Sequence, residues 1–335
     1  MKSINIDDIK LTKKLGSGMF GTTYLGLYKN KKYAVKIEKI SEKDLEYNLV
    51  CRDWRDIEFS ENFANGYPEQ FIYLYKYDLI NNCKHIQEYA TGEIPKHLPE
   101  EVIKKLEEKQ KSNYCIRKVY SLLDTTFSNI YDELTKEQFY SFIGQIAYIH
   151  LLLKQNNYTH NDFHGQNAGI LFVKKNKKLD ILNYNFPTFG IQCKAIDYGM
   201  VLNNKYKMNQ NEKKIHKQYK TEEIDRLIRR LIYFEDNKYF NKLITSDKDI
   251  NLLNETKKHF LFKSTKDLCK DIKNRFLIFQ ILYPEEFQKI FLKDKFENTS
   301  YPKCKIDLVD FIYILNNNSN SKNIINLCYN KLINK

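Results

Sequence analysis

The chain has 335 residues, of which 42% are hydrophobic and 14% aromatic, so it can bury a core and is not a disordered protein. Its length allows two domains or one unit of two lobes. No apolar run approaches the roughly 18 residues of a membrane span, and the N-terminus carries charges where a signal peptide has an apolar stretch. We therefore expect an intracellular, cytoplasmic protein with no membrane span.

Cysteine usage and charge restrict the class of protein further. The seven cysteines are scattered and include no C-x-x-C pair, which indicates neither a disulfide framework nor a zinc site and is typical of a reducing compartment. The net charge of +13 could attract nucleic acid, anionic lipid or acidic proteins. However, Lys, Asn, Ile and Tyr all have A/T-rich codons and are all abundant, so genome composition alone explains the lysines. We do not expect nucleic acid as a partner.

Strand signals dominate the first 123 residues. Runs of apolar or alternating residues bounded by turn signals predict five strands there: Ile9–Leu15, Thr22–Tyr28, Lys32–Ile37, Phe71–Ile80 and Cys115–Leu123. A hairpin turn is predicted at Lys29 and Asn30, and a helix over Lys43–Ala64. Residues 81–113 look like an insertion, with an exposed helix over Pro99–Lys111.

The rest of the chain has a different character. Apolar residues at helical spacing predict a helix over Lys136–Gln155, and from Thr221 onward the pattern is almost entirely helical, including Asp267–Tyr283 and Lys305–Leu315. Strands followed by helices along one chain indicate an α+β protein with segregated lobes. We place the lobes at residues 1–123 and 124–335.

Two motifs in the first lobe are suited to binding phosphate. The segment Gly16-Ser17-Gly18-Met19-Phe20-Gly21 lies between two predicted strands, where glycines let backbone N–H groups approach a triphosphate. An ordinary glycine-rich hairpin has the same pattern, but a dinucleotide fold is excluded because a strand follows. Lys36, after Tyr33-Ala34-Val35, can point inward from a half-buried strand, where it needs an anion. In a lysine-rich chain such a placement can also be chance.

Two motifs in the second lobe carry carboxylates. The segment from His160 to Asn167 reads H-x-D-x-x-x-x-N, in which Asp162 could deprotonate or orient a hydroxyl and Asn167 could hold a metal. A zinc site of His160 and His164 fits poorly because the glycine and polar surroundings argue against a helix. Asp197 ends a predicted short strand, two residues before a glycine, and is either a Mg²⁺ ligand or part of an ordinary turn.

The four motifs, in this order, resemble the eukaryotic-type protein kinase superfamily over about residues 9–234. The composition and the His-Asn-Asp form look similar to the divergent serine/threonine kinases of large DNA viruses, which implies host cytoplasm or virion as the location if the chain is viral. The resemblance implies a bilobal protein-kinase-like fold with a small β-rich N-terminal lobe and a larger helical C-terminal lobe. It also implies ATP and Mg²⁺ (or Mn²⁺) as cofactors and transfer of the γ-phosphate to Ser/Thr of protein substrates.

The resemblance assigns roles to residues. Asp162 is the catalytic base, Lys36 pairs with the α- and β-phosphates, and Asn167 and Asp197 hold the metal. Tyr120 stands at the back of an adenine pocket. The implied nucleotide-binding residues are Leu15, Gly16, Ser17, Gly18, Met19, Phe20, Gly21, Thr22, Thr23, Lys36, Ser121 and Leu123. For the acidic partner of Lys36 on the following helix we predict Glu58, with Asp56 and Glu61 as alternatives.

Some positions depart from the kinase pattern. Asn161 stands where many regulated kinases have Arg, which suggests that no phosphorylated activation loop is needed. His164 stands where serine/threonine kinases usually have Lys and is similar to small-molecule phosphotransferases of kinase-like fold. No A-P-E follows Asp197, and Asp225 looks like the buried aspartate of a central helix.

These departures leave alternatives open. One is phosphotransfer to a non-protein hydroxyl of a small molecule or lipid, and another is a non-catalytic kinase-like binding module. A basic stretch after Asp197 either favours acidic protein substrates or is a solvated loop. Its lysines are Lys205, Lys207, Lys213, Lys214, Lys217 and Lys220.

Overall fold

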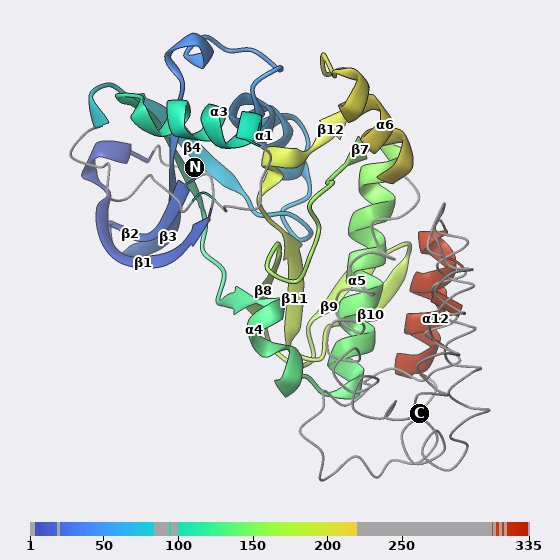
Figure 1. Ribbon diagram of the computed structural model, residues 1–335. Helices are drawn as coiled ribbons and strands as arrows, with labels where there is room; N and C mark the ends of the chain where they lie inside the picture. Colours follow the sequence, from blue (N-terminus) through green and yellow to red (C-terminus); the bar gives the residue numbers. More distant parts are fainter. Residues whose placement is uncertain are drawn as a thin grey trace, which may run out of the picture. The chain divides into compact units, whose positions relative to one another are not determined.

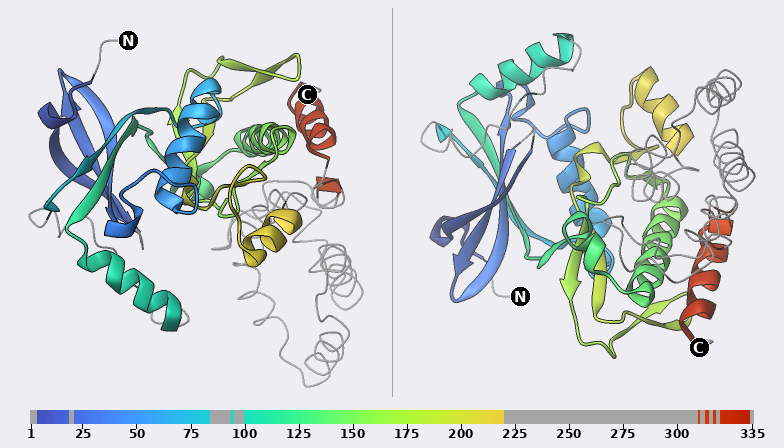
Figure 2. Two further views of the ribbon diagram at one scale, coloured as in Figure 1. Left: turned by 90° about the horizontal axis from the view of Figure 1, so that it is seen from above. Right: turned by 60° about the horizontal axis from the view of Figure 1, so that its bottom comes forward.

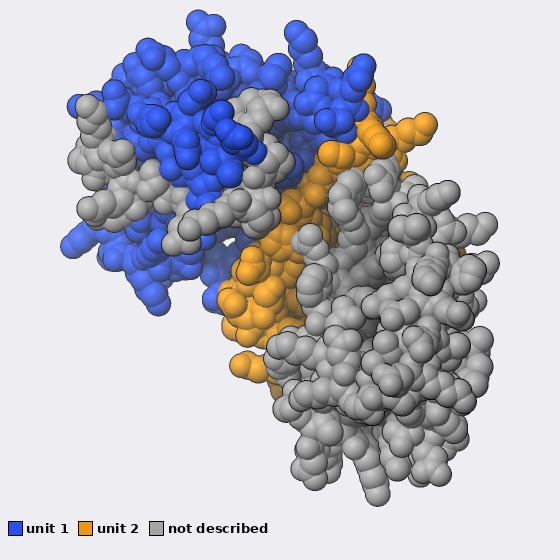
Figure 3. Space-filling model, viewed as in Figure 1, with its two compact units in different colours: residues 1–124, 194–212 blue, residues 125–193, 213–335 orange. Residues whose placement is uncertain are grey.

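The computed structural model describes residues 4–18, 21–83, 94, 100–219, 310, 313–314, 317 and 320–333. The chain forms two compact units, coloured separately in Figure 3. Unit 1 comprises residues 1–124 and 194–212, and unit 2 comprises residues 125–193 and 213–335. The sequence analysis ended the first lobe at residue 123, and unit 1 includes the chain up to residue 124. The sequence analysis also assigned residues 194–212 to the second lobe, whereas in the structure they cluster with unit 1. The predicted helix Asp267–Tyr283 and Asp225 lie outside the described residues, as does most of Lys305–Leu315.

Unit 1 is built on a five-stranded antiparallel sheet with the strand order β1-β2-β3-β5-β4 (Figure 1). The prediction of a strand-rich N-terminal part in a mixed α/β protein is confirmed, and the structure adds that its sheet is antiparallel. Its strands are β1 (Lys10–Gly18), β2 (Gly21–Tyr28), β3 (Lys31–Ile40), β4 (Leu74–Ile80) and β5 (Tyr114–Ser121). Lys29 and Asn30 form the predicted hairpin turn, with φ of 46° and 62°, as a two-residue connection requires.

The two faces of this sheet differ in chemistry. One face packs an apolar cluster that includes Ile9, Val35, Ile37 and Val119. The cluster also contains Cys83 and Cys115, which form a disulfide. The sequence analysis did not predict this disulfide, because the scattered spacing of the cysteines gives no sign of which two could pair. The folding of β4 and β5 side by side is what brings them together.

The helix after β3 is shorter than predicted. The sequence indicated Lys43–Ala64, whereas the structure has a 3-10 turn η2 (Glu42–Asp44) and the helix α1 (Arg52–Asn62). The Asn48 side chain accepts a hydrogen bond from the Cys51 N–H at 2.9 Å, which turns the chain before the helix begins. All residues from Asp53 to Ser60 are buried, including four charged ones, so α1 lies inside unit 1 and not on its surface.

The remaining elements of unit 1 are short or peripheral. Helix α3 (Glu100–Lys111) agrees with the predicted helix Pro99–Lys111 over all of its described residues. Pro99 and most of the predicted insertion before it, residues 84–93 and 95–98, lie outside the described residues. Lys109 of α3 forms an ion pair with Asp53 of α1 at 2.7 Å. The others are η1 (Ile6–Asp8), η3 (Ala64–Gly66), η6 (Tyr198–Met200) and β12 (Leu202–Asn203).

Unit 2 is organised around α5 (Lys136–Gln155), whose bounds match the prediction. Thr135 and Gln138 form a capping box at its start. Helix α12 (Ser321–Ile333) lies beside α5 in the views of Figures 1 and 2. A hydrogen bond of 2.9 Å joins His150 of α5 to Ser321 of α12.

Strands in unit 2 were not predicted beyond the short one before Asp197. The structure has a three-stranded sheet in the order β11-β8-β6 and a β9–β10 hairpin. The hairpin turns at Leu182 and Asn183, both with positive φ, and Leu182 gives no sequence signal for such a turn. The other elements are β6 (Thr125–Thr126), α4 (Phe127–Ile130), η5 (Tyr131–Glu133), β7 (Tyr158–Thr159), β8 (Ala168–Phe172), β9 (Lys178–Ile181), β10 (Tyr184–Pro187), β11 (Ile191–Ala195) and α6 (Gln210–Tyr219).

A search for membrane spans covered the described part of the chain and found no helix that is both long and apolar enough to cross a bilayer.

Candidate functional site

Two of the predicted site residues meet in unit 1, although 161 positions separate them in the sequence. Lys36 Nζ donates a hydrogen bond of 2.9 Å to Asp197 Oδ1 and lies 3.2 Å from Glu38 Oε1. Burial by itself lowers the pKa of Lys36, but the charges of Asp197 and Glu38 outweigh burial and raise that pKa. Lys36 is therefore a charged ammonium group in the interior of unit 1.

The backbone around Asp197 is tied to unit 1 by its neighbour. Tyr198 is fully buried, and its hydroxyl donates to Ala195 O and accepts from the Ile72 N–H, both at 2.8 Å. Asp197 itself has a left-handed backbone with φ of 59°, which few residues other than glycine adopt without support. The hydrogen bonds of Tyr198 supply that support and aim the carboxylate at Lys36.

The charge state of Asp197 is set by two cations. Burial tends to raise the pKa of this carboxyl group, but Lys36 and Arg52 lower it to about 2. The Arg52 guanidinium covers Gly199, where an added Cβ would come within 2.4 Å of Arg52 Nη2. A carboxylate that stays ionised is the form that binds a divalent cation.

The glycine-rich segment has open space beside two of its three glycines. A Cβ added at Gly16 or Gly18 would meet nothing within 4 Å, so contacts within the described chain do not require glycine at either position. Gly21 differs, because a Cβ there would lie 2.3 Å from Ile37 O of the neighbouring strand. Leu15 is 45% exposed beside the loop. Met19 and Phe20 lie outside the described residues.

The partner of Lys36 differs from the one that the sequence predicted. Glu58 accepts hydrogen bonds from the Tyr206 hydroxyl and from Asn62 Nδ2, the latter at 3.4 Å, and Glu61 is exposed. The carboxylates at Lys36 are those of Glu38 and Asp197. The prediction of a Lys36–Glu58 pair is therefore wrong. Helical spacing could not show that Glu58 faces Tyr206.

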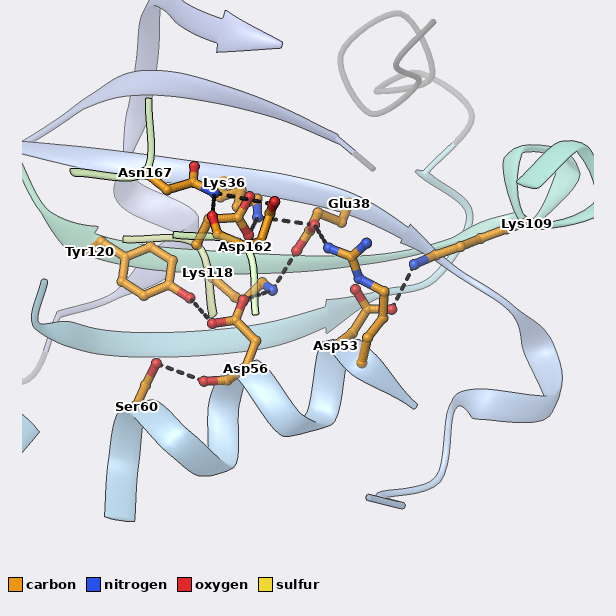
Figure 4. Close-up of polar contacts among 12 residues, drawn as sticks. Lys36, Glu38, Asp53, Asp56, Ser60, Lys109, Lys118, Tyr120, Asp162 and Asn167 are labelled. Atoms are coloured by element: carbon orange, nitrogen blue, oxygen red, sulfur yellow. Dashed lines mark hydrogen bonds and ion pairs between the residues drawn. The ribbon is translucent and has the colours of Figure 1, made fainter. Parts of the chain in front are cut away.

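A buried polar network on this face of the sheet was missed altogether (Figure 4). Lys118 of β5 forms ion pairs with Glu38 of β3 and Asp56 of α1, and each of the three side chains is at most 2% exposed. The Tyr120 hydroxyl donates to Asp56 Oδ1 at 3.0 Å. Lys118 follows Arg117 within the predicted strand Cys115–Leu123, so no local pattern marks it as a buried charge.

The predicted adenine-binding segment follows Tyr120 directly. Ser121 ends β5, and its N–H donates to Tyr73 O at 2.9 Å, while its hydroxyl accepts from the Tyr73 N–H at 3.2 Å. The Ser121 N–H is therefore already used by the protein. Leu123, the other predicted residue of this segment, is half-buried.

The H-x-D-x-x-x-x-N segment lies in unit 2, between β7 and β8, and is not helical. Asn167 Nδ2 donates to Asp162 O at 2.8 Å and to Asp162 Oδ2 at 3.2 Å, so the asparagine orients the aspartate. The Asp162 carboxylate is 43% exposed, and His164 Nε2 lies 3.6 Å from its other oxygen. An exposed, oriented carboxylate is suited to accept a proton from an incoming hydroxyl group.

The donor atoms fit a hard cation that a nucleotide brings with it. Among the described residues, no cluster of three or more His, Cys, Asp or Glu side chains could hold a metal ion by itself. Mg²⁺ commonly binds through one or two protein oxygens together with substrate phosphates. Taken by itself, unit 1 has one such oxygen ligand in the Asp197 carboxylate. Unit 2, also taken by itself, has the Asn167 amide oxygen, because the amide nitrogen of Asn167 is bonded to Asp162.

No known protein family matches this chain, and no curated protein matches it in sequence.

Proposed function

We propose that this protein is an ATP- and Mg²⁺-dependent protein kinase of bilobal kinase-like fold that phosphorylates Ser or Thr. The observation that carries the proposal is the Lys36–Asp197 ion pair of 2.9 Å, in a unit that also presents the open glycine loop. A buried lysine beside an ionised carboxylate is the arrangement that binds phosphates and a divalent cation together. Chance placement of a lysine does not explain why two distant motifs meet in this way.

Each of these residues has its own proposed role in phosphoryl transfer. Lys36 binds the α- and β-phosphates and the glycine loop covers them, while Asp197 and Asn167 are the proposed metal ligands. Mg²⁺, when bound, supplies charge neutralisation for the transferred phosphoryl group. Asp162 orients the acceptor hydroxyl and takes its proton, and Asn167 keeps Asp162 in place through the hydrogen bonds described above. The positioning of these groups, with no covalent intermediate, is sufficient for this reaction.

Acidic proteins are the proposed substrates. Lys205, Lys207, Lys213, Lys214 and Lys217 are all exposed, while Lys220 lies outside the described residues. Exposed lysines in one stretch of chain attract acidic peptides by long-range electrostatics, and this attraction weakens as salt is added.

One contact favours a second candidate, phosphotransfer to a non-protein hydroxyl group of a small molecule or lipid. His164 Nε2 lies 3.6 Å from the Asp162 carboxylate, so an imidazole and not an ammonium group stands next to the proposed base. A neutral imidazole can bind a hydroxyl of a small acceptor directly. A non-catalytic binding module is the third reading, and it would bind ATP without turnover.

A transfer assay tests the proposal. The protein is incubated with Mg²⁺ and ATP labelled at the γ-phosphate in separate reactions. These contain casein, a basic protein, a metabolite panel or no added acceptor. Label on Ser or Thr that is lost in Asp162→Ala, while ATP binding is kept, supports a protein kinase. Asp180→Ala serves as the control, because Asp180 is an exposed aspartate of the same unit on β9. Full transfer by Asp162→Ala would refute the assignment of the base, and label only on a metabolite panel would favour the second candidate.

A further inference from the structure

The buried network in unit 1 places two lysines directly opposite each other. Lys36 of β3 and Lys118 of β5 are partners in the antiparallel register. Like charges at directly opposed positions of a sheet repel each other. Glu38 is the carboxylate that contacts both lysines, because it directs Oε1 to Lys36 at 3.2 Å and Oε2 to Lys118. Each lysine also has a second partner, Asp197 for Lys36 and Asp56 for Lys118.

Glu38 is held in place by burial and by charge. Its side chain is 1% exposed, and it is two residues from Lys36 on the same strand and the same face. Burial favours the neutral acid, but Lys118, Lys36 and Arg52 together lower the pKa of Glu38 well below its ordinary value. Glu38 is therefore an anion with cations on both sides.

Helix α1 contacts this network from the other end. Asp56 pairs with Lys118, and Arg52, one helical turn earlier, lies 3.9 Å from Glu38. The contacts run from Asp56 through Lys118 and Glu38 to Lys36, as Figure 4 shows for the side chains within unit 1. Glu58, which the kinase resemblance would place at Lys36, is bound to Tyr206 instead.

We propose that Glu38, held by Lys118, is the positioning residue for Lys36, and that it does the work that an acidic residue of the helix does in the kinase pattern. This inference rests on the proposed function, because Lys36 is the residue proposed to bind the phosphates. A partner on its own strand holds Lys36 without any movement of α1. The protein therefore needs no inward movement of the helix in order to bind nucleotide.

A binding experiment distinguishes the proposed role of Glu38 from a role of Glu58. The affinity for Mg²⁺-ATP is measured by calorimetry for the wild type, Glu38→Gln, Glu58→Gln and Glu61→Gln, with circular dichroism as the check on folding. Loss of one charge-assisted contact predicts an affinity that is lower by about ten- to a hundredfold in Glu38→Gln. Glu61→Gln, an exposed residue of α1, is the control and is expected to match the wild type. The inference is overturned if Glu38→Gln binds as Glu61→Gln does, or if Glu58→Gln has the larger effect.

A second measurement needs no nucleotide. The rate at which Lys36 reacts with an acetylating reagent at pH 8 is determined by mass spectrometry, relative to the exposed Lys205 of the same molecule. Without the Glu38 carboxylate beside it, the Lys36 side chain is expected to leave its place next to β3 and become more accessible to the reagent, so its relative rate should rise several-fold in Glu38→Gln. A merely structural role of Glu38 would leave this ratio unchanged, and an unchanged ratio refutes the proposal.

The two measurements distinguish failure of the inference from failure of the proposed function. If the wild type binds no nucleotide but the Lys36 rate rises in Glu38→Gln, the proposed kinase function fails while Glu38 still positions Lys36. Lys118→Met removes the contact that holds Glu38 Oε2, so it tests the other half of the network by its affinity for Mg²⁺-ATP, which is expected to fall as in Glu38→Gln. If Lys118→Met does not fold, Glu38→Gln decides alone, since it keeps the shape of the side chain.

Discussion

Replacing Asp56 by Asn should destabilise unit 1 far more than an ordinary surface change does. The Asp56 carboxylate is 2% exposed and forms an ion pair with Lys118, while its second oxygen accepts the Tyr120 hydroxyl at 3.0 Å. Removing one member of a buried ion pair costs about 3–5 kcal/mol, because the other charge stays buried without its partner. Lys118 keeps Glu38, and asparagine can still accept from Tyr120, so we expect the lower end, about 3 kcal/mol.

The only tryptophan of the chain makes this measurable. Trp54 lies two residues from Asp56 on α1, is 4% exposed, and donates to Asp44 O at 2.7 Å. Urea unfolding followed by its fluorescence therefore reports on unit 1. Glu61→Gln on the same helix is the matched control, and as an exposed substitution it should change the unfolding free energy by less than about 0.5 kcal/mol. If Asp56→Asn shifts the urea midpoint no more than Glu61→Gln does, the buried network does not anchor α1.

Three further predictions follow from single contacts. Gly21→Ala should destabilise the protein by about 1–3 kcal/mol, because its Cβ would lie 2.3 Å from a backbone oxygen of β3, whereas Gly16→Ala meets nothing and should leave the urea midpoint unchanged. The pKa of Asp197 is lowered to about 2, so its ion pairs contribute stability above its ordinary pKa near 3.8 and lose that contribution as the pH falls toward 2. Because its side chain is 34% exposed, the contribution is screened to roughly 1 kcal/mol, and acid titration of tryptophan fluorescence should be shallower over that range in Asp197→Asn. The double substitution Cys83→Ser and Cys115→Ser should lower the free energy of unfolding by about 2–4 kcal/mol when no reductant is present, and by much less when one is present. Equal effects in both conditions would show that the disulfide does not form in solution.

Much of unit 1 could be predicted from the sequence because its signals are local. Alternation of apolar residues depends only on the neighbours along a strand, and it indicated all five strands of the sheet. The turn at Lys29 and Asn30 and the capping of α5 by Thr135 are also encoded within a few residues. The β9–β10 hairpin was missed because Leu182 adopts a positive φ that its side chain does not favour, so tertiary packing must support it.

The candidate site was predictable in its motifs but not in its contacts. Lys36, Asp162, Asn167 and Asp197 were singled out by short motifs whose chemistry depends on residue type and spacing. The structure adds that Lys36 meets Asp197 in unit 1 and that Asn167 orients Asp162 in unit 2.

The choice of partner for each buried charge depends on the tertiary structure. Lys118 was passed over in the sequence because a lone lysine in a lysine-rich chain carries no signal, yet strand register sets it opposite Lys36. Once two ammonium groups face each other in the interior, a carboxylate must lie between them, and Glu38 is within reach where Glu58 is not. Spacing along the chain can indicate that a lysine needs an anion, but register and burial decide which carboxylate supplies it.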